Sequence, residues 1–444
     1  MTSASLLALS ASAAAQDAPA AFLAGIGVRD ITPEPGVRMW GYANRANPAS
    51  GTLDPLLTKA LVIRTGDMTL AIVTMDLGRV PIEPVCNRIR AHAKKAGVDH
   101  VTFIASHTHG GPVMEYDDMP HIKRIEAGII AAIDEAIKKL VPARIGSGST
   151  TIDISHNRRV IRDGQCYMLW RNEKKVPTDP IDHEATLIRI DAESGAPLAV
   201  LVHYACHPVV LGHDNEQYTG DWVGEMARQV GAKTGAECLF LQGAAGDINP
   251  YLDKTPLPMG GIESMRNVGQ EAAEAVLRGY ASIKTETPTD PSLGVSDQFV
   301  RIGTRWDFSE KSQQDIFRSV YGPVFESYIA ILTRELSVPL SVVVINKDIA
   351  LAFMPGELFV QYQIDMKLRS VLPKTLLCGY ANDFHLYFPT LQGAAAGGYG
   401  GIVATYVGNG AGDRLVDEAL IDIGNLSGKI KNELQMSDFE LKEA

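Results

Sequence analysis

The sequence predicts an α/β fold in which mixed β-sheets are flanked by helices. Short apolar runs typical of strands alternate with amphipathic helical stretches along the whole chain. Of the 444 residues, 45% are hydrophobic and 21% are charged, an ordinary globular composition that excludes disorder for most of the chain. Polar side chains follow several of the apolar runs directly, and the C-terminal ends of strands are where open α/β sheets form a ligand crevice.

The predicted strands are apolar runs of β-type composition that are bounded by polar or glycine-containing segments. They cover residues 60–64, 70–75, 101–105, 198–204, 238–241, 341–345, 349–353 and 375–378.

Amphipathic helices are predicted at residues 121–140, 268–280 and 358–371. In the first of these, isoleucines recur at three- and four-residue spacing, which indicates one buried face. Residues 285–294 form a polar stretch with prolines, which we expect to be a linker or a surface loop. Residues 425–444 are charged and lack a strand pattern, so we expect a surface helix or a frayed tail.

The composition argues against several classes of protein. The chain has 41 Lys+Arg against 52 Asp+Glu, a formal net charge of −11. This charge disfavours nucleic acid, because phosphate binding needs a basic surface, and it equally disfavours electrostatic docking on anionic lipid. The five cysteines lie far apart and form no C-x-x-C pair, so neither a zinc finger nor a disulfide framework is predicted.

The N-terminus has features of an export signal. An apolar run at residues 6–9 precedes small residues, among which Ala13 and Ala15 fit an A-x-A cleavage pattern. We therefore expect a signal peptide over residues 1–15 and a periplasmic or secreted mature chain over residues 16–444. No Lys or Arg precedes the apolar run, so an Ala-rich disordered tail is the alternative. No later stretch reaches the roughly 20 apolar residues of a transmembrane helix.

Candidate functional residues sit just past the ends of five predicted strands, and we expect the five loops to converge on one site. In chain order these residues are His107, His109, His207, Asp247, Asn249, Glu357 and Tyr387.

The strongest local motif is Ser-His-Thr-His-Gly-Gly-Pro at residues 106–112. In a loop after a strand the two imidazoles can diverge, one to a metal and the other to a substrate or a metal-bound water. A buried, hydrogen-bonded histidine pair is the alternative. In the second cluster His207 precedes a proline at a strand exit and is the better ligand, whereas His203 and Cys206 are expected in the core and His213 is expected to be exposed.

Two histidines and a carboxylate make a zinc set with an open position for water, whose pKa the ion lowers to about 7. There is no H-E-x-x-H motif. Asp247 is expected to orient a ligand histidine or hold a water, although a plain turn is the alternative. Glu357, in Pro-Gly-Glu, is also favoured at a helix start by the helix dipole, and Tyr387 has packing as its alternative role.

In order and spacing, these motifs resemble the N-terminal catalytic domain of the neutral (non-lysosomal) ceramidase family. The resemblance includes Ala-Gly-Ile-Gly-Val-Arg-Asp-Ile-Thr-Pro at residues 24–33, Met-Trp-Gly-Tyr at 39–42 and Gly-Gly-Tyr at 397–399, and it extends over nearly the whole mature chain. The family hydrolyses an N-acyl amide with one zinc ion, which two histidines, a glutamate and a tyrosine bind. The resemblance therefore implies a small-molecule or lipid-like N-acyl substrate and Zn2+ as cofactor.

The same resemblance implies roles for individual residues. The zinc ligands would be His107, His207, Glu357 and Tyr387. His109 would act on the zinc-bound water or the scissile carbonyl. Arg158 would contact substrate, and so would Asp221, whose Thr-Gly-Asp matches a Ser-Gly-Asp of the family.

This sequence departs from the family pattern at three points. Of two tyrosines expected three residues apart, the first is Phe384. The serine of Gly-Asp-Val-Ser-Pro is replaced by Asn249, whose amide cannot be a nucleophile but can donate a hydrogen bond to an oxyanion. We also expect no C-terminal immunoglobulin-like domain.

The sequence therefore predicts a zinc-dependent hydrolase that cleaves the amide of ceramide or of another N-acyl compound. A metal-dependent esterase or glycoconjugate hydrolase on the same fold is one alternative. A non-catalytic protein that binds a metal or ligand is the other.

Overall fold

The computed structural model describes residues 21–322, 326 and 335–434. The predicted signal peptide over residues 1–15 lies outside these described residues. Within the described part of the chain, no helix has both the length and the apolar composition that crossing a bilayer requires.

The larger of two main sheets has eight strands in the order β13-β11-β10-β6-β1-β3-β4-β5. The pairs β4–β5 and β11–β13 are parallel, whereas the other neighbours are antiparallel, so the sheet is mixed. Its strands are β1 (Leu23–Asp30), β3 (Leu57–Thr65), β4 (Met68–Met75), β5 (His100–Ala105), β6 (Val141–Thr151), β10 (Glu184–Ala192), β11 (Pro197–Tyr204) and β13 (Glu237–Gln242).

This sheet is strongly curved. Its two edge strands, β5 and β13, come into contact although they stand at opposite ends of the strand order. The Lys59 ammonium on β3 also lies 3.0 Å from the Glu237 carboxylate on β13. The curvature therefore brings together loops that the hydrogen-bonded ladder alone keeps far apart.

The second sheet has four strands in the order β15-β16-β17-β19, and β17 and β19 are parallel. Its strands are β15 (Leu293–Gly303), β16 (Glu335–Ile345), β17 (Ile349–Phe353) and β19 (Lys374–Cys378). Side chains of both sheets form one buried cluster, in which Leu61, Ile72 and Leu201 join Val343 and Leu351. The two sheets therefore pack face to face.

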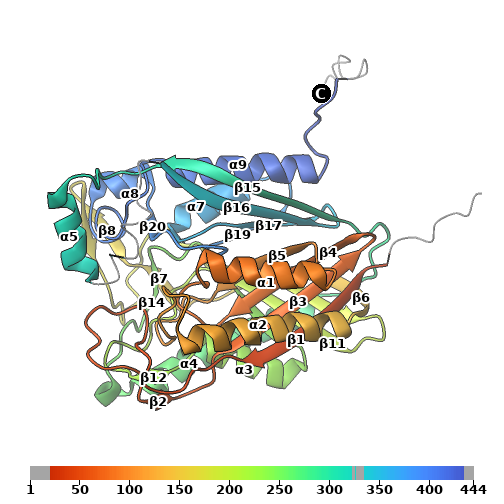
Figure 1. Cartoon of the computed structure of the whole chain (residues 1–444), viewed down its shortest axis with the longest axis horizontal. Helices are drawn as coiled ribbons and strands as arrows, with labels where there is room; N and C mark the ends of the chain where they lie inside the picture. The colour runs from red at the N-terminus through yellow and green to blue at the C-terminus, as the bar shows by residue number, and fades with distance from the viewer. Residues whose placement is uncertain (1–20, 323–325, 327–334, 435–444) are drawn as a thin grey trace, which may run out of the picture.

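Helices cover the outer faces of this pair of sheets (Figure 1). Helices α1 and α2 pack on β3, β4 and β5, α3 and α4 pack on β10 and β11, and α7 and α9 cover the second sheet. The helices are α1 (Glu83–Lys95), α2 (Pro120–Lys138), α3 (Asp221–Thr234), η1 (Leu257–Met259), α4 (Gly261–Ser282), α5 (Lys311–Tyr321), α7 (Val360–Arg369), α8 (Leu391–Ala396) and α9 (Ala411–Leu426).

Every apolar run predicted as a strand is a strand, and the three predicted helices are helices α2, α4 and α7. The loop predicted at residues 285–294 is a loop over residues 285–292, which leads from α4 to the second sheet, and residues 293 and 294 already belong to β15. A surface helix or a frayed tail was predicted for residues 425–444. Residues 425 and 426 are the end of α9, and the described residues that follow, 427–434, contain no helix. Strands β1, β6, β10 and β15 were missed, partly because glycines and polar residues interrupt their apolar pattern.

Four short strand pairs lie outside the two main sheets, and two of them carry candidate site residues. They consist of β2 (Gly51–Thr52) with β12 (Gln217–Tyr218), β7 (Ser155–Asn157) with β14 (Ile248–Pro250), β8 (Arg159–Arg162) with β9 (Gln165–Met168), and β18 (Glu357–Leu358) with β20 (Tyr387–Phe388).

Helix α2 lies so close to β1 that only glycine fits between them. A Cβ atom on Gly27 would stand 2.0 Å from the Ala132 carbonyl oxygen. We expect Gly27→Ala to lower the free energy of unfolding by about 1–3 kcal/mol, because the helix must shift to relieve the clash. Denaturant titration measures this change. Gly51→Ala is the control, since its nearest neighbour would lie 3.5 Å away, and an equal effect of both variants would contradict the prediction.

Candidate active site

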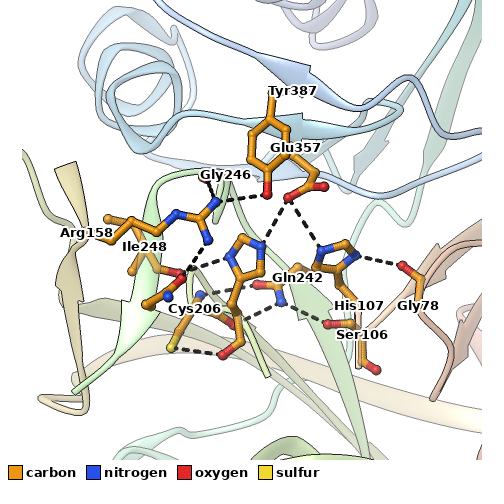
Figure 2. A network of polar contacts seen from close by, with 12 residues as sticks. Gly78, Ser106, His107, Arg158, Cys206, Gln242, Gly246, Ile248, Glu357 and Tyr387 are labelled. Atoms are coloured by element: carbon orange, nitrogen blue, oxygen red, sulfur yellow. Dashed lines mark hydrogen bonds and ion pairs between the residues drawn. The ribbon is translucent and has the colours of Figure 1, made fainter. Parts of the chain in front are cut away.

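The candidate residues meet where strands of both sheets end (Figure 2). His107 follows β5, and His207 follows β11. Glu357 follows β17 and lies on β18, whereas Tyr387 lies on β20. The structure therefore brings these side chains together close to the C-terminal ends of strands.

The backbone of His107 adopts a left-handed conformation, with φ of 69°. Its amide donates to the Leu77 carbonyl at 2.9 Å, and its imidazole Nδ1 lies 2.7 Å from the Gly78 carbonyl. Because a carbonyl oxygen only accepts, Nδ1 is the donor of this hydrogen bond. Nε2 is then the nitrogen that the ring presents to the site. The ring lies on Tyr380, with 4.2 Å between the ring centroids.

His207 is fixed in the same way by the segment that follows β13. Both its amide and its Nδ1 face the Ile248 carbonyl, at 3.0 and 3.1 Å. Burial lowers the pKa of the His207 imidazole below its ordinary value, so the ring is neutral at pH 7. Its Nε2 therefore also presents a lone pair to the site.

Both Nε2 atoms face one carboxylate oxygen. Oε2 of Glu357 lies 3.1 Å from Nε2 of His207 and 3.5 Å from Nε2 of His107. Burial by itself raises the pKa of Glu357, but the adjoining histidines outweigh it and hold that pKa below its ordinary value. Two imidazole nitrogens and one carboxylate oxygen thus converge in a buried place, a donor set that a divalent cation can bind.

These separations fit a tetrahedral zinc site. Ligand atoms that each lie about 2.0–2.1 Å from a zinc ion are roughly 3.3 Å apart. The observed distances of 3.1 and 3.5 Å from Glu357 to the two imidazoles bracket that value. Each imidazole is also held through its other nitrogen by a backbone carbonyl, the outer contact that metal-binding histidines usually have. The donor set therefore suits zinc.

His109 turns its ring to the same side as His107, with 5.1 Å between their centroids. One nitrogen from each of His107, His109 and His207 can be chosen so that all three atoms lie within 4.8 Å of one another. Neither nitrogen of His109 has a hydrogen-bond partner among the described residues. Burial, and then the neighbouring histidines, lower its pKa well below the ordinary value. The glycine at 41 leaves room for this ring, since a Cβ there would lie 2.4 Å from it.

Tyr387 is aligned with Glu357 by the short parallel pair β18–β20, in which the two residues are direct partners. Its phenol accepts a hydrogen bond of 2.9 Å from the Arg158 guanidinium, and burial raises its pKa well above the ordinary value. Figure 2 shows the Tyr387 hydroxyl beside the Glu357 carboxylate. The phenol is therefore neutral and oriented by Arg158.

Arg158, predicted to contact substrate, is buried among protein groups. Besides Tyr387, its guanidinium donates to Oδ1 of Asn249 at 3.0 Å and to the Gly246 carbonyl at 2.7 Å. It also packs against the ring of Trp170, 5.2 Å from its centroid. The Arg158 guanidinium thus orients two groups that the sequence predicted in the site, the Tyr387 phenol and the Asn249 side-chain amide.

Within the described part of the chain, no hydrogen bond joins the Asp247 carboxylate to a histidine. Its carboxylate accepts from the amide of Val360, the first residue of α7, at 2.8 Å and from the Asn157 side chain at 2.9 Å. The expected contact with a ligand histidine is instead made by the neighbouring Ile248 carbonyl. Asp247 therefore fixes the helix that follows Glu357.

Asp221, expected at a substrate contact, is also occupied by backbone groups. Its carboxylate accepts from the amides of Val210, Leu211 and Trp222 at 2.8 to 3.1 Å. It lies at the start of α3 with φ of 54°. It thereby shapes the loop after His207.

The remaining sequence expectations in this region are confirmed. His203 is buried and its Nε2 lies 2.8 Å from the Leu377 carbonyl, Cys206 is buried, and His213 is exposed. The sequence did not predict two aromatic residues that pack against His107. The ring of Tyr380 lies against its imidazole, and the ring of Trp40 meets it edge-on. Trp40 lies in the Met-Trp-Gly-Tyr segment, but no pattern in the sequence indicates that it packs on a histidine.

We expect Asp247→Ala to lower the free energy of unfolding by about 1–2 kcal/mol, because the buried Val360 amide loses its acceptor. Thermal or denaturant unfolding measures this loss. Asp365→Ala is the control on the same helix, since in the described part of the chain the Asp365 carboxylate accepts a hydrogen bond only from the Gln361 side chain. If the two variants lose stability equally, Asp247 does not fix the start of α7.

Comparison with known proteins gives consistent matches. A sequence model described as neutral/alkaline non-lysosomal ceramidase, N-terminal, matches residues 22–255. A crystal structure of neutral ceramidase from Pseudomonas aeruginosa has a TM-score of 0.73 at 19% identity, over 94% of this chain and 76% of that chain. A structure of ceramidase complexed with C2 has a TM-score of 0.72 at 19% identity, with the same coverage of 94% and 76%. These structures confirm the predicted fold class.

Proposed function

The chain belongs to the neutral/alkaline non-lysosomal ceramidase family, and we propose that it is a zinc-dependent hydrolase of an amide bond. The observation that carries this proposal is the convergence of two imidazoles and one carboxylate, in which the Nε2 atoms of His107 and His207 lie 3.5 and 3.1 Å from Oε2 of Glu357. We assign His107, His207, Glu357 and Tyr387 as the residues that hold the ion. Bound there, zinc would supply a Lewis acid that polarises a carbonyl and lowers the pKa of water.

The other residues would act on the substrate directly. His109 has a neutral ring and no competing hydrogen bond in the described part of the chain, so we assign it to accept a proton from the attacking water and return it to the leaving amine. The Tyr387 phenol and the Asn249 amide are our candidates to stabilise the oxyanion. Arg158 orients both groups and supplies positive charge behind them.

The proposed substrate is ceramide or another N-acyl compound. The family membership supports this class, and the two similar structures are ceramidases at 19% identity. Asn249, in place of the family's serine, leaves the attack to water rather than to a side chain. We further propose that residues 16–444 are one catalytic domain that acts in the periplasm or outside the cell after removal of residues 1–15.

Metal binding is tested by equilibrium dialysis of the chelator-treated protein against zinc, with the bound metal measured by mass spectrometry. We expect one equivalent per chain in the native protein and a loss of binding in His107→Ala and His207→Ala, because each removes one converging acceptor. His213→Ala is the matched control, since this histidine is exposed on a nearby loop. Zinc retained by both site variants would contradict the ligand assignment.

Catalysis is tested with a fluorescent short-chain ceramide and a panel of N-acyl amides and esters. We expect His109→Ala to bind zinc normally but to lose about 10²–10⁴-fold in kcat, the usual contribution of a general acid–base. His213→Ala is again the control. Turnover of esters alone would favour an esterase, and zinc binding without turnover of any compound would favour a non-catalytic protein.

A further inference from the structure

Gln242, the last residue of β13, joins the two strand exits that lead to the histidines (Figure 2). Its side chain is completely buried. The amide Nε2 donates to the Ser106 carbonyl at 2.9 Å and to the Cys206 carbonyl at 3.0 Å. Its Oε1 accepts from the Cys206 amide at 3.3 Å. Both amide protons are therefore used, and each contacts the residue directly before a candidate metal ligand.

The two carbonyls belong to the peptide groups that begin His107 and His207. Fixing a carbonyl also fixes the plane of its peptide, because the peptide bond is rigid. The Ser106 peptide leads into the left-handed backbone of His107, a conformation that persists only where its surroundings hold it. Gln242 thus fixes the two peptide groups that lead into His107 and His207. The orientation of these groups directs the two imidazoles into the site.

The sheet itself does not set the distance between these histidines. His107 follows the edge strand β5, whereas His207 follows β11, next to the opposite edge. The ladder between β5 and β11 passes through five other strands. The curvature of the sheet closes this gap in space, and the side chain of Gln242 spans it with direct hydrogen bonds.

We propose that Gln242 is a positioning residue that sets the separation of the His107 and His207 imidazoles and thereby the affinity of the site for a divalent cation. The proposal rests on the proposed function, because it presumes that these imidazoles bind the ion. Outer contacts that orient metal ligands typically change metal affinity by about 10–100-fold when they are removed.

The test compares the zinc affinity of apo-protein variants by competition with a chromogenic chelator, and it does not use activity. Gln242→Met preserves approximate size but removes both donors. We expect its zinc Kd to rise by about 10–100-fold. Gln363→Met is the matched control, because Gln363 is an equally buried glutamine that bonds to Asp182 and to the Ala244 amide and contacts neither histidine. We expect this control to lose thermal stability but to keep the native Kd.

A second variant keeps the test decisive if Gln242→Met does not fold. Gln242→Glu retains the side-chain shape but turns a carboxyl oxygen toward two carbonyls, so we expect the same weakening of zinc binding. Native Kd values in the folded Gln242 variants, or an equal loss of affinity in Gln363→Met, would overturn the proposal. If the native protein itself binds no zinc, the proposed function fails, and this outcome is distinct from native zinc binding that is unaffected by Gln242.

Discussion

The contact of one carboxylate oxygen of Glu357 with two imidazoles is the interaction on which the rest of the site depends. Each imidazole donates through Nδ1 to a backbone carbonyl, and its Nε2 faces the carboxylate. A charged carboxylate in a buried place is unfavourable unless it is paired. A divalent cation bound between these groups would supply the paired charge, and the backbone fixes each imidazole independently of the other.

The curvature of the larger sheet makes this contact possible. Edge strands β5 and β13 approach each other, and the second sheet packs against the inner face of the larger one. Loops that are distant in the sequence thereby end beside one another. The short pair β18–β20 then places Glu357 and Tyr387 side by side, and Arg158 ties Tyr387 to Asn249.

Several residues around this site hold unusual backbone conformations. His107, Tyr380 and Leu386 have positive φ angles of 69°, 55° and 56°. Such conformations cost of order 1–3 kcal/mol for residues other than glycine and persist where tertiary contacts impose them. Here they turn the chain sharply at strand ends. At His107 the turn leaves its ring and that of His109 close together, with 5.1 Å between the ring centroids.

The sequence by itself determined the α/β class, most of the strands, and the strand ends at which His107, His207 and Glu357 stand, because apolar periodicity and residue order are local properties. It did not determine that Asp247 and Asp221 bind backbone amides, that Tyr380 lies beneath His107, or that Gln242 joins two strand exits. Those contacts connect loops and the ends of strands and helices that only the folded chain brings together. Only the tertiary structure decides them, because hydrogen-bond partners far apart in the chain leave no periodic pattern in it.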